Sequence, residues 1–250
     1  MLTLLLASMT GFRTDPPSGS SGGRGSTGHR GEIVWDADAH DLETDLEYFS
    51  AAFGTRLPVV DFGCGDGRQT RFLRRHFGTV LGADVSPSAI ERAWAAGCAP
   101  GVSYRILDAR DHEAAAGLHR ELGDVNVYIR GVLQALSPAA RPQAVETIAE
   151  LLGGTGTLFV KELPREASSY FAAVAGRHGL SPGLARVMRL VPPGEISEPD
   201  LVRLFPADRF DVLSTGTSHM HTVNTLPDGE VITVPAIYAV IRRVGTRRSS

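Results

Sequence analysis

Residues 57–67 have the sequence LPVVDFGCGDG, a short apolar run that passes directly into a glycine-rich loop. The run is typical of a buried strand, and glycines at its end permit a tight turn and a close approach of a ligand to the backbone. The spacing is G-x-G-x-G, and Arg68 stands where a dinucleotide-binding loop has its third glycine. The chain has no G-x-x-x-x-G-K-[ST] motif. The loop therefore suits neither a pyrophosphate nor a nucleoside triphosphate.

Two carboxylates stand at the ends of apolar runs beside this loop. Asp61 precedes the glycines, and Asp84 ends the next run, residues 79–84. A carboxylate at the first place attracts a cationic or amino-bearing ligand and repels a phosphate, whereas one at the second can accept both hydroxyls of a ribose. The pair predicts a nucleoside ligand that carries positive charge. The alternative is a plain glycine turn with two helix-capping aspartates.

Apolar runs and helical patterns alternate along much of the chain. Strands are expected at 57–62, 79–84, 102–107, 124–130 and 157–162, and helices at 41–53, 68–77, 86–96, 112–122 and 138–152. Ser86 and Pro87 can serve as N-cap and first residue of one helix. Alternation at this interval is typical of βαβ units, so the fold class is α/β with a mostly parallel sheet and helices on both faces.

The pattern changes after residue 163. Residues 163–204 carry large apolar side chains and are expected to form a substrate-lid insert, because ligands of such sheets bind at the carboxyl ends of the strands. Strands are expected at 209–214 and 232–243, with a long polar connection over 215–230. The final strand follows a reversal of the chain, so we expect it to be antiparallel.

The glycine loop with Asp61 and Asp84 resembles the cofactor site of class I S-adenosylmethionine-dependent methyltransferases, and the resemblance covers residues 32–243. It implies a Rossmann-like, seven-stranded, mostly parallel sheet with an antiparallel last strand, and S-adenosyl-L-methionine as the cofactor. The cofactor-binding residues that it implies are Trp35, Asp61, Gly63, Cys64, Gly65, Gly67, Asp84, Val85, Asp108, Ala109 and Arg130.

The resemblance also implies a role for each part of this set. Asp61 and the glycine loop hold the methionine end, and Asp84 holds the ribose. Val85 lies against the adenine, and the acid of the Asp108–Ala109 pair meets the adenine amino group. In the same way Arg130 lies beside the reactive sulfonium, and Trp35 with the helix after it covers the cofactor. For Asp108 the alternative is a helix N-cap.

The end of the fourth expected strand restricts the acceptor. Family members that methylate amino groups of bases or of glutamine carry Asn/Asp-Pro-Pro-aromatic there, whereas residues 128–131 are YIRG. Cytosine C5 enzymes use a Pro-Cys nucleophile there, and the two cysteines, Cys64 and Cys98, stand elsewhere. We therefore expect a small organic acceptor, apolar or aromatic, of the kind used in specialised metabolism. The alternatives are a carboxylate or protein side chain, or cofactor binding without methyl transfer, as in a regulator or cyclase.

His219 and His221 are the candidate catalytic residues. They stand two positions apart, so on an extended chain both point to the same side. If the acceptor carries a proton, an imidazole is a suitable base, because free histidine titrates near neutral pH. Metal binding is a second possibility, but the spacing places no third ligand, so no metal site is predicted. A surface or hydrogen-bonded role is the alternative for both.

Composition sets the remaining limits. The chain has 250 residues, of which 42% are hydrophobic and 21% charged, which suits one large globular domain. We expect a flexible tail over residues 1–31, the domain over 32–245 and a frayed end over 246–250. The net charge of −3 gives no basic field for nucleic acid, and no apolar run reaches the roughly 18 residues of a membrane helix. A cytoplasmic protein with a small-molecule substrate is expected, and the oligomeric state is left open.

Overall fold

The computed structural model of the protein describes residues 39–54, 56–179, 182, 184–185, 188 and 196–244. The expected tail over 1–31 and the end over 246–250 lie outside these residues. The elements are α1 (Ala39–Phe53), β1 (Val59–Phe62), α2 (Arg68–Leu73), β2 (Val80–Asp84), α3 (Pro87–Ala95), β3 (Val102–Ile106), α4 (His112–Leu122), β4 (Asn126–Arg130), the 3₁₀ turn η1 (Leu133–Ala135), α5 (Arg141–Leu152), β5 (Thr157–Glu162), α6 (Ala167–His178), α8 (Glu198–Arg203), β6 (Phe210–Thr225) and β7 (Val231–Arg243).

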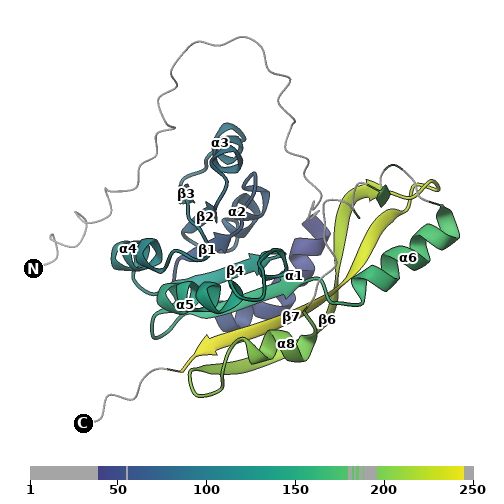
Figure 1. Cartoon of the computed structure of the whole chain (residues 1–250). Coiled ribbons are helices and arrows are strands. Elements are labelled where there is room, and N and C mark those ends of the chain that lie inside the picture. The colour runs from purple at the N-terminus through teal and green to yellow at the C-terminus, as the bar shows by residue number, and fades with distance from the viewer. Residues whose placement is uncertain are drawn as a thin grey trace, which may run out of the picture.

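Seven strands form one sheet in the order β3-β2-β1-β4-β5-β7-β6 (Figure 1). Strands β1 to β5 pair in parallel, and β7 pairs antiparallel with both β5 and β6. Strand β6 consequently runs in the same direction as the first five. The carboxyl ends of β1, β2 and β4 meet at one edge, where the strand order reverses, and this is the place where α/β sheets bind ligands. The expected Rossmann-like fold and its antiparallel last strand are confirmed.

The alternation of side chains along the strands divides the core between two faces. Phe49 of α1 packs on Tyr128 and Phe159 on one face, the face that also carries α2. On the other face, Val127 and Ile148 belong to the cluster that α4, α5 and α8 cover. Successive strand residues point to opposite faces, so Tyr128 and its neighbour Val127 enter different layers.

The β6–β7 hairpin is longer than its sequence pattern indicates. The expected polar connection over 215–230 is wrong, because β6 continues to Thr225 and only residues 226–230 form the turn. Met220 on β6 is fully buried in a small cluster with Phe171 of α6 and Val234 of β7. Ser218 and Met220 are buried, whereas Thr217, His219 and His221 between and beside them are more exposed, so this part of β6 has the alternation of a half-buried strand. Figure 1 shows α6 running alongside this extended hairpin.

Two helix boundaries differ from the expected ones by three or more residues. The helix expected at 68–77 ends at Leu73, after which Arg75 and His76 donate to carbonyls only three residues back, as in a tighter turn. The helix expected at 138–152 begins at Arg141, which places Pro142 in its first turn. Proline is tolerated there because the first helical N–H groups have no partner within the helix.

Candidate active site

The glycine-rich loop follows β1 at the edge where the strand order reverses. Gly63, Gly65 and Gly67 have φ values of 84°, 56° and 76°, a region that favours glycine. A side chain on Gly63 would collide with Val132, and one on Gly67 with Tyr104, whereas one on Gly65 would meet nothing within 4 Å. The loop therefore packs against protein on two sides and leaves open space beside Gly65, where a ligand can approach the backbone.

Asp61 lies under this loop with only 1% of its surface exposed. The Thr70 hydroxyl donates a hydrogen bond of 2.6 Å to its Oδ2. Burial, together with the nearby negative Asp84, raises the pKa of Asp61 to about 7, although the hydrogen bond from Thr70 lowers it. A nearby cation would favour the ionised carboxylate, so the charge of Asp61 can respond to a cationic ligand.

Asp84 connects the loop to the turn that follows β2. Its Oδ2 accepts the Gly65 N–H at 2.9 Å, and its Oδ1 accepts the Ser86 N–H at 2.8 Å. The helix-capping alternative is wrong for Asp84, because Ser86 caps α3 by accepting the Ala89 N–H. A carboxylate oxygen can accept more than one hydrogen bond, so Asp84 can still accept from a ligand.

Two large apolar side chains lie exposed beside these carboxylates. Val85 after β2 is 59% exposed, and Ile106 at the end of the neighbouring β3 is 58% exposed. Ile106 is not among the residues predicted from the sequence. It stands two positions after the buried Tyr104, so the alternation along a strand predicts a buried side chain there as well. Asp108 forms a two-pronged ion pair with Arg110, so its carboxylate is already engaged on one side. Asp111 caps α4 instead, which makes the N-cap alternative wrong for Asp108.

Two of the expected cofactor residues, Cys64 and Ala109, contribute no side chain to this edge. Cys64 is buried against Ile90 and Tyr104, and burial raises the pKa of its thiol far above the usual value, so it is no nucleophile. The Ala109 methyl group is buried in the core of the opposite face. Only the backbone of these two residues can contact a ligand at the edge. Trp35 lies outside the described residues.

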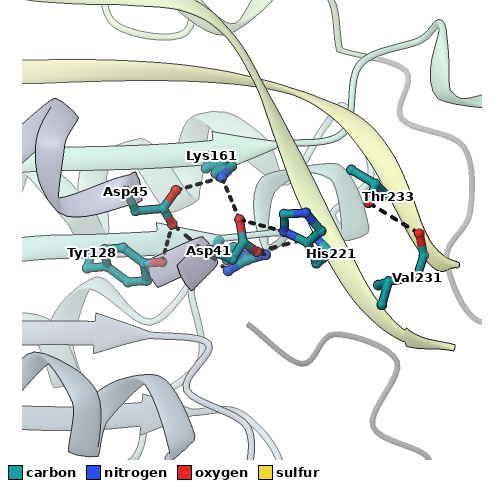
Figure 2. Close-up of polar contacts among 8 residues, drawn as sticks. Asp41, Asp45, Tyr128, Lys161, His221, Val231 and Thr233 are labelled. Carbon is teal, nitrogen blue, oxygen red and sulfur yellow. Dashed lines mark hydrogen bonds and ion pairs between the residues drawn. The ribbon is translucent and has the colours of Figure 1, made fainter. Parts of the chain in front are cut away.

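Arg130 ends β4 and belongs to a buried charge cluster under α1. It pairs with Asp41, while Lys161 donates to Asp45 at 2.6 Å and lies 3.4 Å from Asp41. The Tyr128 hydroxyl donates to Asp45 at 2.7 Å. Figure 2 shows the two aspartates facing Tyr128 and Lys161. The two carboxylates balance the two cations, and all five side chains are buried, so the cluster satisfies the rule that buried charges are paired.

Asp41, Asp45 and Lys161 of this cluster are not among the site residues predicted from the sequence, although each shows a weak local signal there. Asp41 and Asp45 are four residues apart, which places them on one face of α1 together with the buried Leu42 and Phe49. Lys161 is the only lysine of the chain and stands in an otherwise apolar strand. A charged residue on an apolar face indicates a buried partner, but the sequence does not say which one.

Glu162, the neighbour of Lys161, supports the loop after β4. Its carboxylate accepts the backbone N–H groups of Val132, Leu133 and Gln134 at 3.1, 3.0 and 2.9 Å. Burial raises the pKa of Glu162 to about 7, although these three hydrogen bonds lower it. The side chain thereby holds the start of η1 beside the carboxyl end of β4, while the Gly131 N–H donates to the Lys161 carbonyl.

The two candidate catalytic histidines lie on β6 beside a cavity of about 520 Å³, which we call the α1–β6 pocket. Both point to the same side of the strand, as their spacing predicts, with Met220 between them buried on the other side. The pocket is lined by Asp41, Thr44, Tyr48, Thr217, Ser218, His219, His221 and Thr233. Its volume suits a small molecule, and its lining is mostly hydroxyl groups and imidazoles.

His221 contacts the buried charge cluster directly. Its backbone N–H donates to Asp41 Oδ2 at 3.3 Å, and its Nδ1 lies 3.5 Å from Asp41 Oδ1. The described residues include no group of three or more His, Cys, Asp or Glu side chains arranged for a metal ion. In the same part of the chain, none of the helices has the length and apolar character that crossing a bilayer requires.

Comparisons with known proteins give a family and a fold. Residues 59–156 match a family model described as a methyltransferase domain. A solved S-adenosylmethionine-dependent methyltransferase from Anabaena variabilis ATCC 29413 is 35% identical, with 84% of this chain and 87% of that chain covered and a TM-score of 0.77. No curated protein matches significantly.

Two more distant structures agree in fold alone. One, solved in work on the conversion of a disulfide bond into a thioacetal group during echinomycin biosynthesis, is 19% identical over 82% of both chains, with a TM-score of 0.62. The other is the N-methyltransferase NodS of Bradyrhizobium japonicum WM9 in complex with S-adenosyl-L-homocysteine. It is 15% identical over 83% of this chain and 89% of that chain, with a TM-score of 0.50.

Proposed function

We propose that this chain, which belongs to the family of S-adenosylmethionine-dependent methyltransferases, methylates a small organic acceptor bound in the α1–β6 pocket. The chain is an enzyme that uses S-adenosyl-L-methionine. The acceptor class and its binding place are the proposal.

The position of Arg130 is the observation that carries this proposal. Its guanidinium pairs with Asp41, which lines the pocket. Strand β4 pairs with β1 at Ile129 and Phe62, so Arg130, the next residue of β4, stands beside the start of the glycine loop. One side chain thus links the loop to the pocket, which supports an acceptor site next to the methionine end of the cofactor.

The residues at the carboxyl edge fit S-adenosyl-L-methionine. The open space beside Gly65 and the exposed Val85 and Ile106 suit a nucleoside, and a buried acid suits its positive charge. In the proposal Asp61 attracts the charged methionine end, Asp84 accepts the ribose hydroxyls, and Val85 with Ile106 lies against the adenine. When bound, the cofactor supplies a methyl group on a positively charged sulfur.

The protein contributes position and a proton acceptor. Hydroxyl groups of Thr44, Thr217 and Thr233 can hold a polar acceptor, and such alignment lowers the barrier by up to about 7–11 kcal/mol in favourable cases. Where the nucleophilic atom of the acceptor carries a proton, His219 or His221 takes it as the bond to the methyl group forms. Asp41 neutralises Arg130, so the guanidinium does not repel the cationic cofactor.

The proposal is tested by following a labelled methyl group. The full-length protein is incubated with methyl-labelled S-adenosyl-L-methionine and a panel of hydroxylated and amino-bearing small molecules, including an extract of metabolites. We expect label in a small molecule. Label in macromolecules only would indicate a protein side chain as acceptor, and bound cofactor without any transfer would indicate a regulator or cyclase; either result contradicts the proposal.

A blocked pocket gives the matched control. Thr217→Trp places a large side chain at an exposed position that lines the pocket. Leu213→Trp introduces the same large side chain at an exposed position of β6 outside the pocket. We expect the first variant to lose methyl transfer and keep its affinity for S-adenosyl-L-methionine. The second should keep both. Equal transfer by the two variants would place the acceptor elsewhere.

We also propose a cytoplasmic location and no membrane or nucleic-acid partner. Both cysteines of the chain, Cys64 and Cys98, are unpaired, which supports a reducing compartment. Fractionation of cells that produce the protein, followed by immunodetection, tests the location.

A further inference from the structure

We propose that Asp41 is a positioning residue that orients His221, so that His221 and not His219 is the base that accepts the proton of the acceptor. This inference rests on the proposed function, since it needs an acceptor in the α1–β6 pocket. It distinguishes two histidines that the sequence pattern leaves equivalent, and it gives the buried charge cluster a part in the reaction.

Asp41 contacts His221 twice. The backbone N–H of His221 donates to Oδ2, and the imidazole Nδ1 lies 3.5 Å from Oδ1, a distance slightly long for a hydrogen bond (Figure 2). Catalytic hydrogen bonds are often long without substrate and shorten when it binds. The first contact fixes the strand and the second fixes the ring, so the carboxylate defines where the imidazole lies.

His219 has no comparable arrangement. It is exposed, whereas the His221 side chain is only 28% exposed. Within the described ranges the His219 side chain makes no ion pair or hydrogen bond. Both rings border the pocket, but only His221 has its ring beside a carboxylate.

The orientation has a chemical consequence. Neutral imidazole carries its proton on one nitrogen, and the bond made by that nitrogen determines which one. If Nδ1–H donates to Asp41, Nε2 keeps its lone pair and can accept a proton from the acceptor. The imidazolium that forms is then stabilised by the carboxylate 3.5 Å away.

Asp41 can perform this role because it stays ionised. Burial alone would raise the pKa of Asp41, but Arg130 and Lys161 lower it below the usual value. Among the described contacts, the charged and titratable groups that surround it are Asp45 on the same helix, Arg130 and Tyr128 on β4, and Lys161 on β5. The two cations hold the negative charge of Asp41 beside the His221 ring.

The first test reads the tautomer of His221 without any ligand. Nitrogen NMR of the full-length protein labelled in histidine distinguishes a protonated Nδ1 from a protonated Nε2, and His221→Gln assigns the signal. We expect His221 to carry its proton on Nδ1. A His221 ring protonated on Nε2 would overturn the proposal, whatever the acceptor proves to be.

The second test separates positioning from stability with the acceptor found in the labelling experiment. Asp41→Asn should lower kcat at least tenfold in the wild-type chain and have no further effect on kcat when His221→Gln is already present. Asp45→Asn is the matched control, because it alters the same cluster without touching His221. Its effect on kcat should be the same with and without His221→Gln. Equal losses from Asp41→Asn in both backgrounds would make Asp41 merely structural.

Discussion

The proposed contact between Asp61 and the charged end of the cofactor predicts that cofactor affinity depends on pH. The Asp61 pKa of about 7 means that a cationic ligand must displace a proton from this carboxyl group at lower pH. The affinity for S-adenosyl-L-methionine should therefore fall up to about tenfold for each pH unit below about 7 and level off above it. Calorimetry over this interval measures the effect.

Asp61→Asn supplies the comparison. The amide keeps the shape and can still accept the Thr70 hydroxyl, but it cannot ionise. We expect weak binding at every pH and a loss of the pH dependence. An affinity of the wild-type chain that stays constant from about pH 6 to 8 would show that Asp61 does not interact with the charge of the cofactor.

Asp84 allows a second prediction about a single residue. If Asp84 binds the ribose as proposed, Asp84→Ala removes hydrogen bonds that are each worth about 1.5–3 kcal/mol, and it also frees the Gly65 N–H. The affinity should fall by roughly one to three decades while the fold is kept. Asp66→Ala, in the same loop, is the control: its carboxylate accepts only the Arg68 N–H among the described contacts. Unchanged binding by Asp84→Ala would contradict the assignment.

Among the elements, the short helix α8 depends on its cap. The Ser197 hydroxyl accepts the Asp200 N–H, and Asp200 in return accepts the Ser197 N–H. Leu201 of this helix is fully buried. Ser197→Ala should cost about 1 kcal/mol and lower Tm by roughly 2–4 °C. Ser50→Ala makes the same chemical change at an exposed position inside α1 and should not lower Tm, because alanine is the better helix former.

For the whole molecule, two buried carboxyl groups make stability depend on pH. Burial raises the pKa of Asp61 and of Glu162 to about 7, above the ordinary 3.8 and 4.5. The folded state therefore binds more protons than the unfolded state in this interval. The stabilisation is complete below about pH 4 and is lost as the pH rises through about 7, by up to about 1.4 kcal/mol per pH unit and group.

Urea unfolding of the ligand-free protein at several pH values between about 5 and 8 tests this expectation. Glu162→Gln lowers stability overall, because the amide cannot accept all three N–H groups after β4 as well as the carboxylate does. The informative quantity is the slope of the free energy of unfolding against pH, which should be shallower in the variant. An identical slope would show that Glu162 is ionised throughout.

Local patterns were enough for most of the fold. The expected ranges 112–122 and 157–162 coincide with α4 and β5, and Ser86 caps the helix that it is expected to start. Helix caps, glycine turns and strand periodicity act over a few residues, so neighbouring residues reveal them. The glycine loop and Asp84 could be located for the same reason, since each stands at the end of a strand.

Contacts between distant segments account for what local patterns left open. Lys161 and Asp41 are 120 residues apart, and His221 and Asp41 are 180 apart. Their partners depend on strand order and on the packing of α1, which no short window contains. The length of β6 has the same origin, because its polar residues form a strand only when β7 and α6 bury the residues between them. Local hydrogen bonds and periodicity suffice to define the elements and the cofactor loop, whereas the pairing of buried charges around His221 requires the folded chain, since desolvation makes each charge depend on a partner from another strand or helix.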